Sequence, residues 1–191
     1  MDLAVLKRYR PVRLDRPDLE QCGVLIPILR QNGSEQILLT VRHSQLKSHP
    51  GEISFPGGKA QATDVSLAAC ALREAEEEIA LEPSLVEVVG ELDQVVVSGR
   101  YVVGPFVGLL ASEASVRPND QEVRSVVTLD INNFLDPARL EILPGIRSSS
   151  SSRVYQFSVG DLRIWGATAR ILKQFLELGY GVSYQDVRAR P

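Results

Sequence analysis

The chain has 191 residues, with 21 basic and 24 acidic side chains and a formal net charge of −3 at pH 7. This balance predicts no general attraction to nucleic acid or to an anionic membrane. No apolar run reaches the length of a membrane span and the N-terminus lacks the apolar region of a signal peptide, so we expect a cytoplasmic protein. The two cysteines, Cys22 and Cys70, form no CxxC pattern, which predicts buried free thiols.

The length suits one main domain preceded by an arm. We expect the arm at residues 1–21, where two Arg-Pro dipeptides interrupt any helix, and the domain at residues 22–191. The arm is expected to pack on the domain or on a second subunit. The apolar, β-branched runs at 23–29 and 36–41 flank Asn32-Gly33, which predicts a β-hairpin.

Strands and helices alternate through the rest of the chain. Further strands are expected at 85–92, 94–97, 101–110, 122–129 and 154–159, with breaks at Ser98-Gly99 and Gly104-Pro105. A short helix is expected at 132–135, a flexible loop at the serine run 148–152, and a core-packing helix at 162–178 anchored by Trp165. This interleaving predicts an α/β fold.

The most informative stretch is residues 55–81, FPGGKAQATDVSLAACALREAEEEIAL, in which a Pro-Gly-Gly turn is expected to precede a helix. Helical spacing places Glu74, Glu77 and Glu78 on one face. An apolar stripe on another side is formed by Ala68, Leu72, Ala75 and Ile79. Clustered carboxylates on a rigid helix suit Mg²⁺, which also takes waters and phosphate oxygens. The alternative is a solvated acidic face. Asp64 is expected to be the N-cap of the helix.

These residues resemble the Nudix box, whose pattern is G, five residues, E, seven residues, then R-E-U-x-E-E-x-G-U, where U is a bulky aliphatic residue. The matching positions are Gly58, Arg73, Glu74, Glu77, Glu78 and Leu81. Asp64 replaces the first Glu with a spacing one residue longer, and Ala75 and Ala80 replace the aliphatic residue and the second glycine. The three acids of the core R-E-x-x-E-E are intact, whereas the shifted Asp64 is a poorer candidate for metal ligation.

A second pattern lies immediately upstream, where residues 38–58 read LLTVRHSQLKSHPGEISFPGG. It resembles the signature LLTxRSx3Rx3GxVxFPGG of the coenzyme A pyrophosphatase branch of the family. His43, Lys47 and Ile53 are the departures, and Lys47 keeps the positive charge. Without the resemblance, Arg42 and Lys47 would be assigned to an ordinary polar loop. With it, they are expected to bind the diphosphate of a substrate.

The resemblance implies a Nudix-type α/β/α sandwich with a mixed β-sheet. It implies that Glu74, Glu77 and Glu78 hold Mg²⁺ or Mn²⁺, that Arg73 orients them through ion pairs, and that the Gly57-Gly58 turn places backbone against substrate. The implied reaction is hydrolysis of coenzyme A or an acyl derivative to adenosine 3′,5′-bisphosphate and the 4′-phosphopantetheine moiety. A homodimer is plausible from the family.

Several alternatives stay open on sequence grounds. The family commonly recruits a further acid as ligand or base, and Glu113, Asp120 and Glu122 are the possibilities here; His43 and His49 are weaker choices for a base. The substrate could be another nucleoside diphosphate derivative, such as a dinucleotide or nucleotide sugar. The domain could also bind nucleotides without turning them over.

Overall fold

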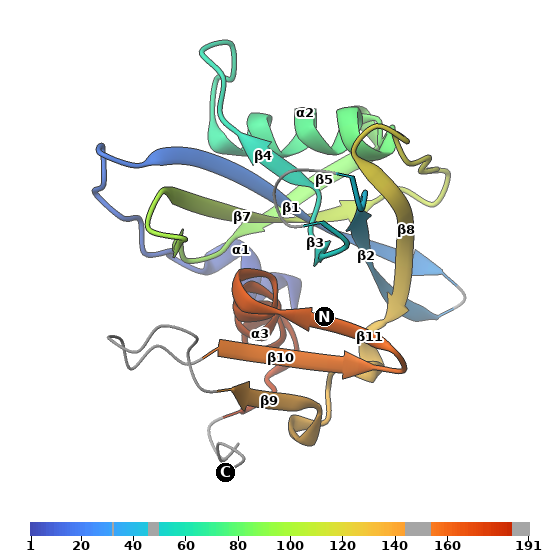
Figure 1. Cartoon of the computed structure of the whole chain (residues 1–191). Helices are drawn as coiled ribbons and strands as arrows, with labels where there is room; N and C mark the ends of the chain where they lie inside the picture. The colour runs from blue at the N-terminus through green and yellow to red at the C-terminus, as the bar shows by residue number, and fades with distance from the viewer. Residues whose placement is uncertain (32, 46–49, 144–153, 185–191) are drawn as a thin grey trace.

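The computed structural model describes residues 1–31, 33–45, 50–143 and 154–184. A mixed β-sheet forms the central layer, and helix α2 (Leu67–Ile79) covers its upper face in Figure 1. Helices α1 (Leu3–Arg8) and α3 (Gly166–Tyr180) lie below it. The expected α/β/α sandwich is therefore confirmed. None of the described helices is long and apolar enough to cross a membrane.

The main sheet has eight strands in the order β3-β2-β1-β7-β5, with β4 paired to β1, β6 to β7 and β8 to β2. Its strands are β1 (Glu20–Gln31), β2 (Ser34–Arg42), β3 (Ile53–Ser54), β4 (Gly57–Lys59), β5 (Val86–Glu91), β6 (Val95–Val97), β7 (Tyr101–Leu110) and β8 (Val123–Asp130). Among the described strands of this sheet, only β1 and β7 pair in parallel, and the other pairings are antiparallel. The sheet is mixed, as expected.

The hairpin prediction is confirmed, because β1 and β2 pair with Gln31 opposite Ser34. The expected break at Gly104-Pro105 is wrong, since β7 runs without interruption from Tyr101 to Leu110. Pro105 lies where the antiparallel neighbour of β7 changes from β6 to β5. A residue without an N–H is tolerated at such a change of partner, and the Leu92 N–H donates to the Pro105 carbonyl at 2.9 Å.

A three-stranded sheet, in the order β11-β10-β9, forms the lower part of the molecule (Figure 1). Its strands are β9 (Leu140–Leu143), β10 (Val154–Val159) and β11 (Leu162–Trp165). Short 3₁₀ turns occupy η1 (Pro83–Leu85), η2 (Ile131–Asn133) and η3 (Pro137–Arg139). The η2 turn overlaps the short helix expected at 132–135. The serine run at 148–152 lies outside the described residues.

The helix expected at 162–178 starts too early, because its first four residues form β11. Gly166, at a φ of +66°, turns the chain from β11 into α3. Trp165 is 37% exposed and does not anchor the core, which corrects the sequence-based expectation. Phe175 takes that position in α3, where it is fully buried together with Phe157 of β10.

The arm packs on the domain through α1. Leu6 is 1% exposed within the core below the sheet, and the side chain of Asp2 caps the helix by accepting from the N–H groups of Ala4 and Val5. The domain boundary at residue 21 stays a prediction; β1 itself begins at Glu20.

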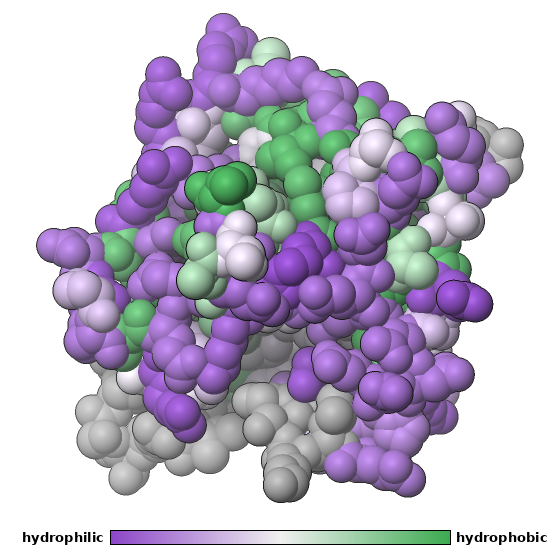
Figure 2. Space-filling view, turned by 90° about the horizontal axis from the view of Figure 1, so that it is seen from above, coloured by the Kyte–Doolittle hydropathy of each residue, from purple (hydrophilic) through white to green (hydrophobic). Residues whose placement is uncertain are grey.

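Between the sheet and α2 lies a second apolar cluster. Ala75 and Ile79 are fully buried in it, as the helical pattern predicted. Ala71 is also fully buried, whereas Ala68 and Leu72 are only partly buried. The surface seen from above is largely hydrophilic around apolar areas near its middle (Figure 2). Helix α2 is therefore amphipathic, because one side packs into this apolar cluster and its polar side chains lie on other sides.

Both cysteines are free and buried, as expected. Burial raises the pKa of the Cys22 thiol to about 11 and also raises that of Cys70. Both thiols therefore stay protonated near neutral pH.

Candidate active site

Helix α2 begins after Ser66, not after Asp64. The Ser66 hydroxyl accepts from the Ala69 N–H at 3.1 Å, so the expectation that Asp64 is the N-cap is wrong. Asp64 instead accepts the Gln61 N–H at 2.8 Å and faces Arg73. The Arg73 guanidinium, and then the Gln61 N–H, lower the pKa of Asp64 to about 2.

Arg73 is the centre of an ion-pair network with three carboxylates of the site. Its Nε and Nη2 donate to the two oxygens of Asp64 at 3.0 and 3.1 Å. Its Nη1 lies 2.9 Å from a carboxylate oxygen of both Glu74 and Glu77, and Nη2 donates to the Lys59 carbonyl at 3.1 Å. Five contacts fix the guanidinium, which in turn limits the rotamers open to Glu74 and Glu77.

Gly57 and Gly58 lie in strand β4, paired with β1, and not in the turn expected from the sequence. A Cβ at either glycine would contact a neighbouring residue closely. A Cβ at Gly58 would lie 2.5 Å from Cδ and Oε2 of Glu74, and one at Gly57 would lie 2.4 Å from the Gly23 carbonyl oxygen. The Gly57 N–H donates to Glu78 Oε2 at 3.2 Å. The two glycines thus bring backbone directly against two of the carboxylates.

Glu78 is an unusual buried acid. It is 4% exposed, and burial raises its pKa to about 7, although the Gly57 N–H and the charge of Arg42 act in the opposite direction. Burial also raises the pKa of Glu74. Arg42 has a buried Nε without a hydrogen-bond partner among the described residues. The site therefore combines two carboxyl groups of raised pKa with a buried Nε–H donor, that of Arg42, which has no hydrogen-bond partner among the described residues.

Glu122 lies next to the strand that carries Arg42, because the His43 N–H donates to the Glu122 carbonyl at 2.8 Å. Its negative charge raises the pKa of both Glu74 and Glu78. Glu113 instead accepts from the Ser112 hydroxyl at 3.1 Å. Sequence reasoning named Glu122 only as one of three possibilities.

The loop before Glu122 caps the end of α2. The backbone N–H of Asn119 donates to the Glu78 carbonyl at 2.8 Å, and its side-chain Nδ2 donates to the Glu77 carbonyl at 3.3 Å. Sequence reasoning missed Asn119. The only local signal was an Asn after Pro118, which is typical of many turns.

Other predicted site residues contribute less or cannot be placed. Lys47 and His49 lie outside the described residues. The Nδ1 of His43 accepts the N–H of Gln45 at 3.2 Å, so the ring is engaged within its own turn. Glu77 lies at the rim of the site, with a side chain that is 55% exposed.

The acids fit a hard divalent cation by their chemistry. In the described part of the chain, no three His, Cys, Asp or Glu side chains converge into a ready-made metal cage. Glu74, Glu77, Glu78 and Glu122 nevertheless offer only oxygen ligands. A cation would offset the burial and mutual repulsion that raise the pKa of Glu74 and Glu78. Mg²⁺ or Mn²⁺ therefore suits this donor set, with water and phosphate oxygens completing its coordination.

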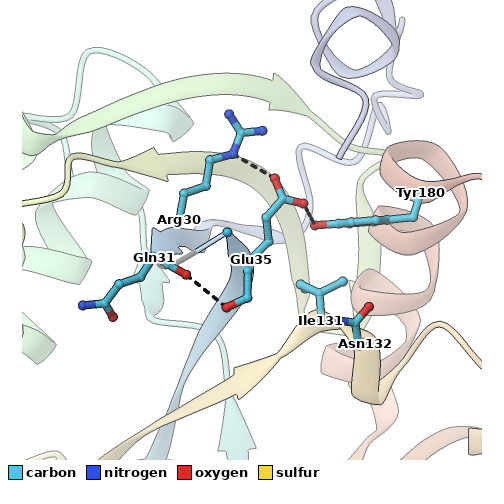
Figure 3. Close-up of a pocket in the computed structure, with 8 residues that line it drawn as sticks. Arg30, Gln31, Glu35, Ile131, Asn132 and Tyr180 are labelled. Carbon is cyan, nitrogen blue, oxygen red and sulfur yellow. Dashed lines mark hydrogen bonds and ion pairs between the residues drawn. The ribbon is translucent and has the colours of Figure 1, made fainter.

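A cavity of about 420 Å³ lies elsewhere, at the opposite end of β2 from Arg42 (Figure 3). Its central carboxylate, Glu35, accepts from Arg30 Nε at 2.8 Å and from the Tyr180 hydroxyl at 2.7 Å. The ammonium group of Met1 also donates to Glu35 at 2.8 Å. These bonds join β1, β2 and α3, so we interpret the cluster as structural.

Comparison with known proteins finds a family match over most of the chain. Residues 20–146 match the family model described as "NUDIX domain". A Shigella flexneri protein named "Uncharacterized Nudix hydrolase NudL" is 39% identical over 182 residues, covering 93% of this chain and 94% of the relative. A relative of the same name from Escherichia coli O1:K1 / APEC is 39% identical over 179 residues, covering 91% and 93%.

Solved structures share the fold. A NUDIX hydrolase from Alicyclobacillus acidocaldarius has a TM-score of 0.57 at 15% identity, covering 91% of this chain and 99% of that chain. A MutT/nudix family protein from Enterococcus faecalis has a TM-score of 0.53 at 16% identity, covering 91% and 66%.

Proposed function

The chain belongs to the Nudix hydrolase family, and on that premise we propose that it hydrolyses the pyrophosphate bond of coenzyme A or its acyl derivatives. The products would be adenosine 3′,5′-bisphosphate and (acyl-)4′-phosphopantetheine. The observation that carries the chemistry is the buried Glu78 beside the half-buried Glu74, both against the backbone of Gly57 and Gly58. The choice of substrate is supported by the sequence pattern at residues 38–58.

Glu74, Glu77 and Glu78 would hold Mg²⁺ or Mn²⁺ in this mechanism. The bound ion would neutralise diphosphate oxygens and lower the pKa of the attacking water. Arg73 would keep Glu74 and Glu77 oriented through its ion pairs. Glu122 supplies a further carboxylate, as a ligand or as the acceptor of the proton from water.

The basic side chains would bind the substrate. Arg42 has a buried Nε with no partner among the described residues, which suits a phosphate oxygen as its acceptor. Lys47 is proposed for the same purpose on the sequence pattern alone.

Departures from the family pattern leave the three proposed metal-binding acids of α2 unchanged. Asp64 still pairs with Arg73 despite its shifted position. Ala80 ends α2 at φ 53° and ψ 30°, the left-handed conformation for which glycine is preferred; strain of about 1 kcal/mol is expected there. The retained Asp64–Arg73 pair supports catalysis, whereas the strain at Ala80 does not distinguish catalysis from nucleotide binding.

The proposal is tested by product chromatography with Mg²⁺ or Mn²⁺ and, in parallel, coenzyme A, a dinucleotide polyphosphate and a nucleotide sugar. Glu77→Gln is the inactive variant, and Glu76→Gln on the exposed side of α2 is the matched control. Adenosine 3′,5′-bisphosphate released from coenzyme A by the wild type and the control alone supports the proposal. Cleavage only of another substrate keeps the chemistry and refutes the specificity, and no cleavage at all favours a nucleotide-binding protein.

A further inference from the structure

The end of α2 is held by two different sets of donors. Within the helix, the Ala80 N–H donates to the Glu76 carbonyl at 2.9 Å and the Leu81 N–H to the Ala75 carbonyl at 3.4 Å. The first bond is that of the αL capping motif, and the two bonds leave the last three carbonyls of the helix without partners in α2 itself.

Those three carbonyls accept from the loop at residues 117–122. The Arg117 N–H donates to the Ile79 carbonyl at 2.8 Å, and the Asn119 N–H donates to the Glu78 carbonyl at 2.8 Å. The Asn119 Nδ2 donates to the Glu77 carbonyl at 3.3 Å. Asn119 therefore hydrogen-bonds to the backbone of Glu77 and Glu78, whose side chains are proposed to hold the cation.

Asn119 also shapes the chain that follows it. Its Oδ1 accepts the Gln121 N–H at 3.2 Å, and its carbonyl accepts the N–H groups of Glu122 and Val123 at 3.0 and 2.8 Å. Val123 is buried and starts β8. One side-chain amide thus donates toward α2 and accepts from the turn that carries Glu122.

We propose that Asn119 is a positioning residue that keeps Glu122 in register with Glu74 and Glu78. The amide is suited to this task because it needs a donor on one side and an acceptor on the other; aspartate lacks the donor, and alanine lacks both groups. The inference rests on the proposed function, because it assigns Glu122 to the same carboxylate cluster. Asn119 would thereby couple the end of α2 to the turn before β8, two segments that are far apart in the sequence.

A double-mutant cycle tests the proposal with Asn119→Ala, Glu122→Gln and the combined variant. Asn133→Ala is the matched control, because it removes a similar amide bond, from Asn133 Nδ2 to the Asp130 carbonyl at 3.0 Å, in η2. The readouts are kcat, KM and the half-saturating Mn²⁺ concentration for the hydrolysed diphosphate, with thermal melts to check folding.

We expect Asn119→Ala to lower kcat or weaken the response to Mn²⁺ by about tenfold, a typical loss for a residue that orients a ligand. In the Glu122→Gln background the same substitution should change either quantity by less than about twofold, because its target is already gone. Asn133→Ala should match the wild type. An equal loss in both backgrounds, or no loss, overturns the proposal.

Failure of the proposed function gives a different result. If the wild type cleaves no diphosphate, that function is refuted, and direct Mn²⁺ titration of the wild type and the three variants of the cycle decides the inference about Asn119. Weaker binding of about tenfold in Asn119→Ala that disappears in the Glu122→Gln background supports it. Equal affinity in wild type and Asn119→Ala overturns it.

Discussion

Replacing Gly58 with alanine should disable the site while leaving the fold intact. The new Cβ would lie 2.5 Å from the Glu74 carboxylate, about 0.9 Å closer than the 3.4 Å at which ordinary contact begins. The obstacle is the end of a flexible side chain, and Gly58 has no left-handed φ, so Glu74 would move and the backbone would stay. A displacement of almost 1 Å in a catalytic group costs about 100-fold in rate.

The assay is metal-dependent diphosphate hydrolysis by Gly58→Ala, with Mn²⁺ varied and thermal melts recorded in parallel. We expect kcat to fall about 100-fold and more Mn²⁺ to be needed, with little change in melting temperature. Gly179→Ala is the control, because a Cβ there meets nothing closer than 3.5 Å. Wild-type kcat and Mn²⁺ dependence in Gly58→Ala would show that Glu74 does not act where the structure places it.

Three further predictions concern neighbouring charges and the cluster at the other end of β2. Folding raises the pKa of Glu78 from 4.5 to about 7. Below pH 4.5 the Glu78 carboxyl is protonated in both the folded and the unfolded protein. As pH rises from 4.5 to 7 the unfolded protein releases this proton first, so the metal-free protein should lose about 3 kcal/mol of unfolding free energy. Urea denaturation should show this slope in the wild type and not in Glu78→Gln. Asp64→Asn should release Arg73 and lower kcat about tenfold; an unchanged kcat would remove Asp64 from the proposed network. Tyr180→Phe deletes the 2.7 Å bond to Glu35 and should cost about 2 kcal/mol in urea denaturation with kcat unchanged, whereas a lower kcat would mean that this cluster is not purely structural.

Local patterns were sufficient for much of the fold. Strand β7 has the bounds expected from its β-branched run, and the hairpin of β1 and β2 forms around Asn-Gly. The common face of Glu74, Glu77 and Glu78 also follows from residue spacing, because three and four residues return a helix to the same side. The errors arose where two neighbouring signals competed. The run after residue 162 has helical spacing, but a left-handed Gly166 divides it into β11 and α3.

By itself, the sequence indicated the family, the α/β class and the common face of the three acids of α2, because motifs, the alternation of elements and helical spacing can be read from nearby residues. Only the tertiary structure placed Glu122 beside the strand that carries Arg42, buried Glu78 and brought Asn119 to the end of α2. The tertiary structure also pairs Asp64 with Arg73, whereas the sequence had predicted that Asp64 caps α2. Burial and charge depend on what the rest of the chain packs nearby, so residues separated by a helix and several strands meet only when the sheet has formed.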